Sequence, residues 1–454
     1  MRPDLSRPRR IHLVGAGGAG MSAIGTVLAE LGHIVSGSDL KGSPALDRLR
    51  ALGVVVSVGH DPSNVDGAEL VGISTAIGPD NPEVRSARLN DIPVFRRSEL
   101  LGAMSSLRET VAVAGTHGKT TTSSMLTLVL IEAGWDPGFI VGGELNEIGS
   151  GASLGSGRWM VVEADESDGT FLGLDARAAV VTNVEPDHID NYGSFDALVA
   201  AFEEFVGRVE GPVVLCADDP CAAALTGRAG ARAVTYGTSV TADYRIVDPI
   251  ASRNSVRFEI ALRGEPLGKI AVPAPGLHVA RNATGALAVA CELGASLQAA
   301  VRALERFSGV ARRFQIRGTL QGVTFVDDYA HLPGEIAATI SAAAGQWDRI
   351  VCVFQPHRFS RIAALGETYG DAFRGAHQVV VTGIYPAGEQ PVPGVTGEVV
   401  ARSVARENPE IPVRYVPDRS ELAGVLREIL RPGDLCLVMS AGDMIGMGPE
   451  VYGQ

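Results

Sequence analysis

The stretch Gly115-Thr116-His117-Gly118-Lys119-Thr120-Thr121 decides the fold of this chain. It follows residues 110–114, an apolar run typical of a buried strand, and precedes residues 120–133, whose apolar side chains recur with helical spacing. A phosphate-binding loop needs glycines that keep backbone N–H groups accessible, a cation for the terminal phosphates and a hydroxyl for magnesium. Because Lys119 and Thr120 are placed for the last two roles, the sequence predicts a nucleotide-phosphate site here.

The scarcity of lysine supports this interpretation. The chain has 39 lysine and arginine residues together, but only three are lysines: Lys41, Lys119 and Lys269. A compact ammonium fits a phosphate cradle that a planar guanidinium would not. The loop departs from the standard GxxxxGK[ST] pattern, because Val113 stands where the first glycine would be.

Two further polar turns follow apolar strands. Residues 163–168 (EADESD) follow the strand 159–162, and residues 183–188 (NVEPDH) follow the strand 178–181. Ligands of parallel sheets bind beyond the carboxyl ends of the strands, so we expect both turns beside the phosphate loop. Oxygen ligands suit magnesium, which makes the carboxylate of Glu163 a candidate. The alternatives are solvated loop acids and, for His188, a histidine that only starts a helix.

The N-terminal region predicts a second phosphate-binding turn. Residues 15–20 (GAGGAG) lie between an apolar strand at 11–14 and a helix-like segment at 21–31, and Asp39 ends the next strand, 19 residues after Gly20. This is the βαβ pattern of a dinucleotide site. A tight turn without a ligand and a pyrophosphate site for another nucleotide remain open, since a helix N-terminus binds any phosphate.

The rest of the chain repeats the same architecture. Apolar strands separated by helical stretches predict an α/β fold with mostly parallel sheets. A small antiparallel patch is expected between 235 and 272. We place three domains at 1–106, 107–317 and 318–454.

The predicted strands of the third domain also end in polar clusters, at 327–331, 355–361 and 440–443. Arg312, Arg313, Arg358 and Arg361 would by default be solvated charges, but near strand ends they suit bidentate binding of phosphate or carboxylate.

Composition excludes several classes. The net charge of −13 argues against a nucleic-acid surface, and no apolar run reaches the ~18 residues that span a bilayer. Five scattered cysteines without a CxxC pair fit a reducing, cytoplasmic location.

Taken together, these motifs resemble the Mur ligase family, the ATP-dependent amide ligases of bacterial cell-wall precursor synthesis. The matching segments are GAGGAGMS at 15–22, SGSD at 36–39, GTHGKTTT at 115–122, EADESD at 163–168, NVEPDHID at 183–190, RNATGALAVA at 281–290, ARRFQ at 311–315, DDYAHLP at 327–333 and QPHRFSR at 355–361. The resemblance implies a Rossmann-like N-terminal domain, a central P-loop ATPase-like domain and a Rossmann-like C-terminal domain.

The resemblance also implies roles for individual residues. ATP would be held by Gly115, Thr116, His117, Gly118, Lys119, Thr120, Thr121, Asn282 at the adenine, Arg313 at the phosphates and Asp328 at the ribose. Magnesium would be bound by Thr120, Glu163 and His188, the last at a second metal or at the acyl-phosphate. The UDP part of the substrate would lie near Gly17, Gly18, Asp39 and Ser74. Tyr329, His331, Arg358 and Arg361 would line the pocket of the reacting groups. Lys119, His188, His331, Arg358 and Arg361 would be the catalytic set. Ala311 and Leu332 replace a glycine and a histidine that relatives often carry, so neither is given a role.

Within the family, the motifs match best the branch that joins L-alanine to the lactyl carboxylate of UDP-N-acetylmuramate through an acyl-phosphate. A recycling ligase that attaches a whole peptide to the same sugar nucleotide is one alternative. A dinucleotide-dependent oxidoreductase is a more distant one, because a dehydrogenase needs no second phosphate loop. We expect ATP and Mg²⁺ as cofactors, no nucleic-acid or membrane partner, and a monomer or homodimer.

Several family members that add later residues carry a carbamylated lysine shortly after the segment that matches His188. This chain has no lysine between Lys119 and Lys269. The absence favours the alanine-adding branch.

Overall fold

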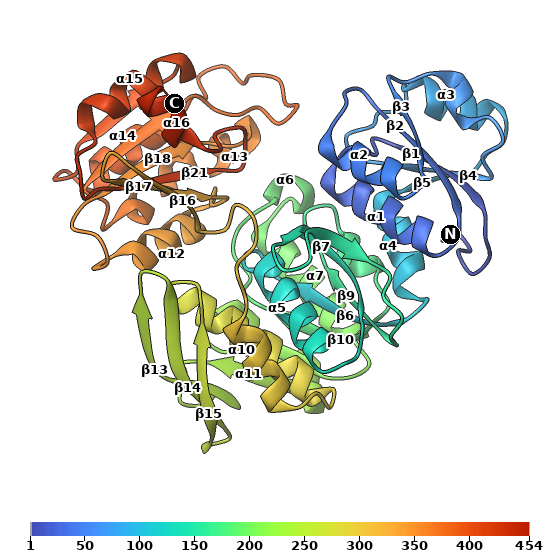
Figure 1. The fold of residues 1–454 in the computed structure, drawn as a ribbon, viewed down its shortest axis with the longest axis horizontal. Helices are drawn as coiled ribbons and strands as arrows, with labels where there is room; N and C mark the ends of the chain where they lie inside the picture. Colours follow the sequence, from blue (N-terminus) through green and yellow to red (C-terminus); the bar gives the residue numbers. More distant parts are fainter. Residues whose placement is uncertain (1, 454) are drawn as a thin grey trace. The chain divides into compact units, whose positions relative to one another are not determined.

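The computed structural model describes residues 2–453. By compactness they form two units, the first holding residues up to 247 with 260–268 and 281–306, and the second holding 248–259, 269–280 and the residues from 307 on. Within the described residues the strands form three β-sheets (Figure 1). The predicted α/β class with mostly parallel sheets is therefore confirmed.

The first sheet has the strand order β3-β2-β1-β4-β5, and its paired strands are parallel. Its strands are β1 (Arg10–Val14), β2 (Ile34–Asp39), β3 (Val55–Val58), β4 (Leu70–Ile73) and β5 (Val94–Arg96). Its helices are α1 (Ala19–Glu30), α2 (Pro44–Ala51), α3 (Pro82–Leu89), α4 (Arg97–Ser105) and the short 3-10 helix η1 (Pro62–Val65). Since β1, α1 and β2 follow one another and the strands pair, the expected βαβ unit is present.

The second sheet has the order β15-β14-β13-β12-β11-β10-β6-β9-β7-β8. Its strands are β6 (Glu109–Ala114), β7 (Gly138–Leu145), β8 (Ser150–Ser153), β9 (Trp159–Glu163), β10 (Ala176–Val181), β11 (Val213–Cys216), β12 (Ala233–Gly237), β13 (Tyr244–Ser252), β14 (Ser255–Leu262) and β15 (Glu265–Val272). Strands β6, β7 and β9–β13 pair in parallel, whereas β8 is antiparallel to β7.

This order positions the site. Strand β6 lies between β9 and β10, with Val113 opposite Glu163 and Ala114 opposite Val181. The turns after β9 and β10 therefore flank the phosphate loop after β6, as the sequence predicted. Residues 111–114 are fully buried, since both faces of a parallel sheet are covered.

Helices connect and follow the strands of this sheet. They are α5 (Lys119–Glu132), α6 (Ile189–Tyr192), α7 (Phe195–Arg208), α8 (Pro220–Ala224), α9 (Thr226–Ala229), α10 (Leu277–Glu292) and α11 (Leu297–Glu305), with the 3-10 helices η2 (Thr170–Gly173) and η3 (Gly230–Arg232). Helix α5 packs against β6, β7 and β9 on one side and against α11 on another. The helix that begins at the phosphate loop is thus anchored in the core.

The third sheet has the order β16-β17-β21-β18-β19-β20, with only β16 antiparallel to its neighbour. Its strands are β16 (Gln315–Leu320), β17 (Val323–Asp328), β18 (Ile350–Gln355), β19 (Gln378–Thr382), β20 (Val413–Val416) and β21 (Leu435–Ser440). Its helices are α12 (Pro333–Ala343), α13 (Phe359–Leu365), α14 (Glu398–Glu407), α15 (Arg419–Ile429) and α16 (Met447–Tyr452), with the 3-10 helices η4 (Gly366–Thr368) and η5 (Gly370–Phe373). One core cluster includes residues of α12 and α14, and the other includes residues of α15 and α16, so both faces are covered.

The domain limits at 106/107 and 317/318 remain predictions, and β16 spans the second of them. Within residues 2–453, no helix combines the length and the apolar character needed to cross a membrane.

Candidate active site

The phosphate loop connects β6 to α5, and its backbone requires two of its glycines. Gly115 has a φ of 131°, and a Cβ there would lie 2.1 Å from Thr182 Oγ1. Gly118 precedes α5 with a φ of 78°, and a Cβ there would lie 2.6 Å from Asn282 Oδ1 in α10. Any side chain would be strained and would collide, so the loop keeps its backbone uncovered. The structure also places Asn282, predicted at the adenine, directly beside the loop.

The turn after β10 holds this loop in place. The backbone N–H of His117 donates to Asn183 Oδ1 at 2.8 Å, and Asn183 Nδ2 donates back to the His117 carbonyl at 3.2 Å. The His117 ring lies 3.1 Å from the Glu185 carboxylate. The sequence motif included Asn183 and Glu185, but sequence reasoning gave neither a role, because their partners lie some 66 to 68 residues away in the chain.

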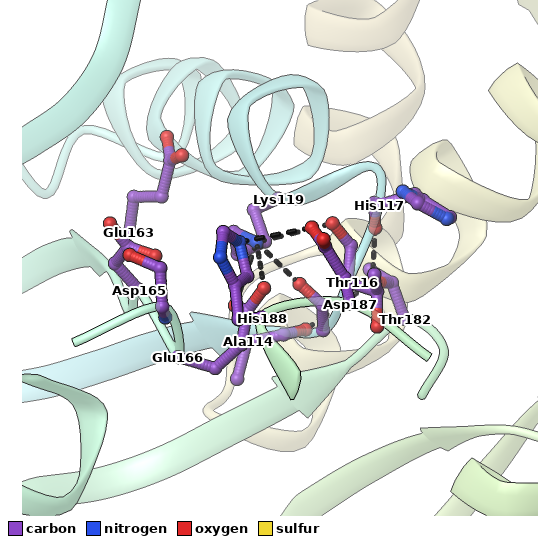
Figure 2. Close-up of polar contacts among 12 residues, drawn as sticks. Ala114, Thr116, His117, Lys119, Glu163, Asp165, Glu166, Thr182, Asp187 and His188 are labelled. Carbon is purple, nitrogen blue, oxygen red and sulfur yellow. Dashed lines mark hydrogen bonds and ion pairs between the residues drawn. The ribbon is translucent and has the colours of Figure 1, made fainter. Parts of the chain in front are cut away.

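Lys119 is already ion-paired within the chain. Its Nζ donates to the carbonyls of Gly115 at 2.6 Å and Thr116 at 3.2 Å, and to both oxygens of the Glu166 carboxylate at 2.7 and 3.0 Å. Burial alone would lower the pKa of Lys119, but the carboxylates of Glu166 and Asp165 outweigh it and raise that pKa. The ammonium is therefore charged and fixed at the loop (Figure 2).

Two residues of the predicted metal site are in contact. Thr120 Oγ1 donates to Glu163 Oε1 at 3.0 Å, while Glu163 Oε2 accepts the N–H of Gly142 at 2.6 Å. A hydroxyl and a carboxylate are the oxygen donors that Mg²⁺ prefers, and this ion usually completes its shell with water and phosphate. The pair therefore fits a magnesium ion held together with ATP.

The position of His188 depends on its left-handed backbone conformation and on a contact with Asp187. It has a φ of 53° at the start of α6, and its Nε2 lies 3.0 Å from Asp187 Oδ2. Among residues 2–453, no three His, Cys, Asp or Glu side chains gather as a metal-binding group. The metal role of His188 stays a prediction.

The acidic turn after β9 also contacts a residue that sequence reasoning missed. Arg97, the first residue of α4, donates from Nη2 to Asp165 at 3.1 Å and to Asp168 at 3.3 Å. Burial alone would raise the pKa of Asp165, but Lys119 and Arg97 outweigh it and lower that pKa to about 2. Arg97 lies in no motif, so only the folded chain reveals it.

The glycine turn of the first sheet brings together the four residues predicted near UDP. The N–H of Gly17 donates to Asp39 Oδ2 at 2.9 Å, and Gly18 immediately precedes α1. A Cβ at Gly15 would lie 2.9 Å from Ser74 Cβ, so Ser74 is packed against the turn. This turn at a helix N-terminus is a suitable place for a diphosphate.

In the second compact unit, the predicted residues gather where β17 ends. Asp328 is buried and accepts the N–H groups of Phe314 and Ala330, each at 2.7 Å. Burial raises the pKa of Asp328 to about 6, although Arg313 and these N–H groups oppose the shift. The guanidinium carbon of Arg313 lies 5.0 Å from the centre of the Tyr329 ring.

The remaining predicted residues are linked through His357. This residue lies in the segment QPHRFSR, but the sequence analysis predicted no role for it. The ring of His331 lies 5.5 Å from that of Tyr329 and 5.7 Å from that of His357. Arg361 Nη1 lies 3.1 Å from His357 Nδ1. Arg358 caps α13 with a φ of 67°, and its Nε is buried with no hydrogen-bond partner among residues 2–453.

The phosphate loop is flanked by two acidic turns on a mostly parallel sheet. In sequence order, the strands of this sheet come after those of the first sheet and before those of the third. Together these features define a nucleotide-dependent α/β enzyme. Models of three consecutive family domains match the chain: the "Mur ligase family, catalytic domain" at 10–109, the "Mur ligase middle domain" at 113–290 and the "Mur ligase, glutamate ligase domain" at 312–442. The chain belongs to the Mur ligase family, as its motifs predicted.

Similarity to individual proteins supports the assignment to this family. The chain is 46% identical over 451 residues to a UDP-N-acetylmuramate--L-alanine ligase of Anaeromyxobacter sp. (strain Fw109-5), which covers 99% of this chain and 98% of the relative. It is similar to the crystal structure of a UDP-N-acetylmuramate-alanine ligase from Thermotoga maritima, with a TM-score of 0.82, 30% identity and 98% of both chains covered. A murein peptide ligase from Psychrobacter arcticus shares the fold, with a TM-score of 0.72, 23% identity and 98% of both chains covered.

Proposed function

We propose that this protein ligates L-alanine to the lactyl carboxylate of UDP-N-acetylmuramate, with ATP cleaved to ADP and phosphate. The observation that carries this proposal is the 46% identity over 99% of the chain to a ligase of that name, with the phosphate-loop lysine Lys119 in place. The product, UDP-N-acetylmuramoyl-L-alanine, is a precursor of bacterial peptidoglycan.

The chemistry proceeds in two displacements. A lactyl carboxylate oxygen attacks the γ-phosphorus of ATP, ADP leaves, and an acyl-phosphate forms. The neutral amine of alanine then attacks the acyl carbon, phosphate leaves, and the nitrogen loses a proton. Both steps move negative charge, so catalysis consists mostly of positioning and charge neutralisation.

The phosphate loop supplies this neutralisation. Lys119 exchanges Glu166 for phosphate oxygens when ATP binds, and the backbone N–H groups at the start of α5 donate to the same phosphates. Thr120 and Glu163 would hold a magnesium ion together with ATP, and this ion would neutralise phosphate charge. We assign His188 to a second metal or to ordering the acyl-phosphate. Because no lysine lies between Lys119 and Lys269, a carbamate has no carrier in this region.

Residues of the second compact unit serve the ribose and alanine. Asp328 contacts the ATP ribose and Arg313 the phosphates. Arg358 and Arg361 bind the carboxylate of alanine. The buried Nε of Arg358 supports this role, since a donor without a partner is costly unless a ligand accepts from it. Tyr329 and His331 line the same pocket.

We also propose that the enzyme works in the cytoplasm, where ATP and UDP-sugars are made, as a monomer or homodimer. UDP-N-acetylmuramate and L-alanine are its proposed partners.

The proposal is tested by ADP release in the presence of UDP-N-acetylmuramate, screened over the twenty amino acids and a stem tripeptide. We expect release with L-alanine and none with the tripeptide. Release driven by the tripeptide alone would identify a recycling ligase instead, and release that needs no UDP-N-acetylmuramate would refute both ligase assignments.

A further inference from the structure

Arg97 belongs to the first sheet's region but reaches the acidic turn of the second sheet. It is the first residue of α4, and its Nη2 lies 3.1 Å from Asp165 and 3.3 Å from Asp168. Its side chain is only 20% exposed. Both regions belong to the same compact unit, so this contact is internal to it.

The same guanidinium lies against the glycine turn. A Cβ at Gly20, in the first turn of α1, would lie 2.9 Å from Arg97 Nη1. Glycine at position 20 therefore gives the arginine room to pass. One side chain thus contacts both the turn proposed for UDP and the acidic turn beside the phosphate loop.

The acidic turn divides its charges between two cations. Glu166 pairs with Lys119 at 2.7 Å, whereas Asp165 and Asp168 pair with Arg97. Asp165 interacts electrostatically with both cations, since each lowers its pKa. Without Arg97, Asp168 would lose its ion pair and Asp165 would keep only the charge of Lys119, so the acidic turn would carry more uncompensated negative charge and would repel the phosphates of ATP.

We propose that Arg97 is a positioning residue for ATP. It belongs to the first predicted domain but acts at the phosphate loop of the second. It neutralises Asp165 and Asp168 and keeps them from competing with Glu166 for Lys119. ATP affinity then depends on a residue outside the ATP-binding domain, next to the turn that holds the other nucleotide. This inference rests on the proposed function, since it concerns the ATP of that reaction.

The test is the dissociation constant for ATP, measured by calorimetry with MgCl2 and no other substrate. We expect Arg97→Gln to raise it about tenfold, less than a unit charge in direct contact with ATP would cost, because the carboxylates act on the phosphates from a distance. Arg97→Lys should restore most of the affinity. Arg48→Gln is the matched control, because Arg48 also joins the two regions, pairing with Glu144 of β7 at 2.7 Å, but lies outside the loop contacts described above. Unchanged affinity in Arg97→Gln, or an equal loss in Arg48→Gln, would overturn the proposal.

A second variant separates charge from folding. Asp168→Asn removes an acid rather than the cation, so it should leave ATP binding unchanged or tighter, and Arg97→Gln/Asp168→Asn should bind better than Arg97→Gln alone. Weaker binding in Asp168→Asn, or no recovery in the double variant, would contradict the electrostatic role. If the wild-type protein bound no ATP, the proposed function would fail; if it bound ATP and Arg97→Gln bound equally well, only this inference would fail.

Discussion

At the scale of single residues, the site is organised by charges paired within the chain. Lys119 is held by Glu166, and Arg97 is held by Asp165 and Asp168. Such preorganised charges need little rearrangement when a phosphoryl group moves, which is where electrostatic catalysis gains most. Substitutions at these residues should therefore affect binding and chemistry more than the fold.

Lys119→Ala should abolish ligation while leaving the affinity for UDP-N-acetylmuramate within about threefold, because the cation acts at ATP phosphates and not at the glycine turn. Coupled ADP release and calorimetry measure the two effects. Lys269→Ala is the control, since that side chain is 84% exposed on β15. A parallel fall in UDP-N-acetylmuramate affinity would show that the two nucleotide sites are not separate.

Glu83, fully buried in the first domain, should make stability depend on acid pH. It accepts hydrogen bonds from Ser38 at 2.6 Å and Asn64 at 2.5 Å. Burial alone would raise its pKa, but the His12 ring, 3.8 Å away, and the hydrogen bonds from Ser38 and Asn64 outweigh it and lower that pKa to about 2. Because the folded pKa lies below the unfolded one, this stabilisation is present above about pH 4.5 and is lost as pH falls toward 2.

Glu83→Gln should accordingly lower the free energy of unfolding at pH 7 by about 3 kcal/mol, and the difference from wild type should shrink at pH 3. Chemical denaturation at the two pH values measures this. Asp47→Asn, an exposed acid of the same domain, should change neither value much. A Glu83→Gln deficit that stayed constant with pH would mean that packing, not charge, explains it.

At the scale of elements, the sequence was sufficient wherever a motif followed a buried strand. It placed the phosphate loop and both acidic turns at one sheet edge, because apolar runs such as 110–114 indicate parallel strands. It missed β7 and β8, where glycines 138, 142, 143 and 151 interrupt the apolar pattern. It also missed β16 and the short β20. It could not find Arg97, because nothing near position 97 in the chain reveals partners 68 and 71 residues away.

The phosphate loop should tolerate no side chain at Gly118. Gly118→Ala would force alanine into a left-handed conformation and against Asn282, so the kcat/KM for ATP should fall at least about tenfold. Gly134→Ala is the matched control: Gly134 follows the other end of α5 with the same φ of 78°, but nothing lies within 4 Å of its added Cβ. Gly134→Ala should lower the free energy of unfolding by ~1 kcal/mol and leave activity intact. Equal kinetics in both variants would show that the approach of Asn282 is unimportant.

At the scale of the whole molecule, the proposed ATP-binding residues are divided between the two compact units, with Lys119 and Asn282 in the first and Arg313 and Asp328 in the second. Length and motifs predicted an α/β fold with mostly parallel sheets and the family. The contact between Arg97 and the acidic turn was not predictable, because it depends on how two regions far apart in the sequence pack within one compact unit.

Activity should be indifferent to dissolved carbon dioxide at fixed pH, because no lysine lies in the described central region except Lys119, already engaged by Glu166, and Lys269, exposed on β15. Steady-state rates in degassed buffer and in buffer with added bicarbonate measure this. A loss of activity on degassing that bicarbonate restored would overturn both the metal assignment and the branch assignment.

We propose that ATP activates the lactyl carboxylate for attack by alanine. The transfer of a carboxylate oxygen to the released phosphate measures this activation. UDP-N-acetylmuramate labelled with ¹⁸O in both carboxylate oxygens is turned over with ATP and L-alanine, and the phosphate released is analysed by mass spectrometry. Because one carboxylate oxygen leaves with the phosphoryl group, we expect one ¹⁸O atom in each phosphate and one in the amide product. Phosphate without label would contradict it, since ATP would then have been cleaved without activating this carboxylate.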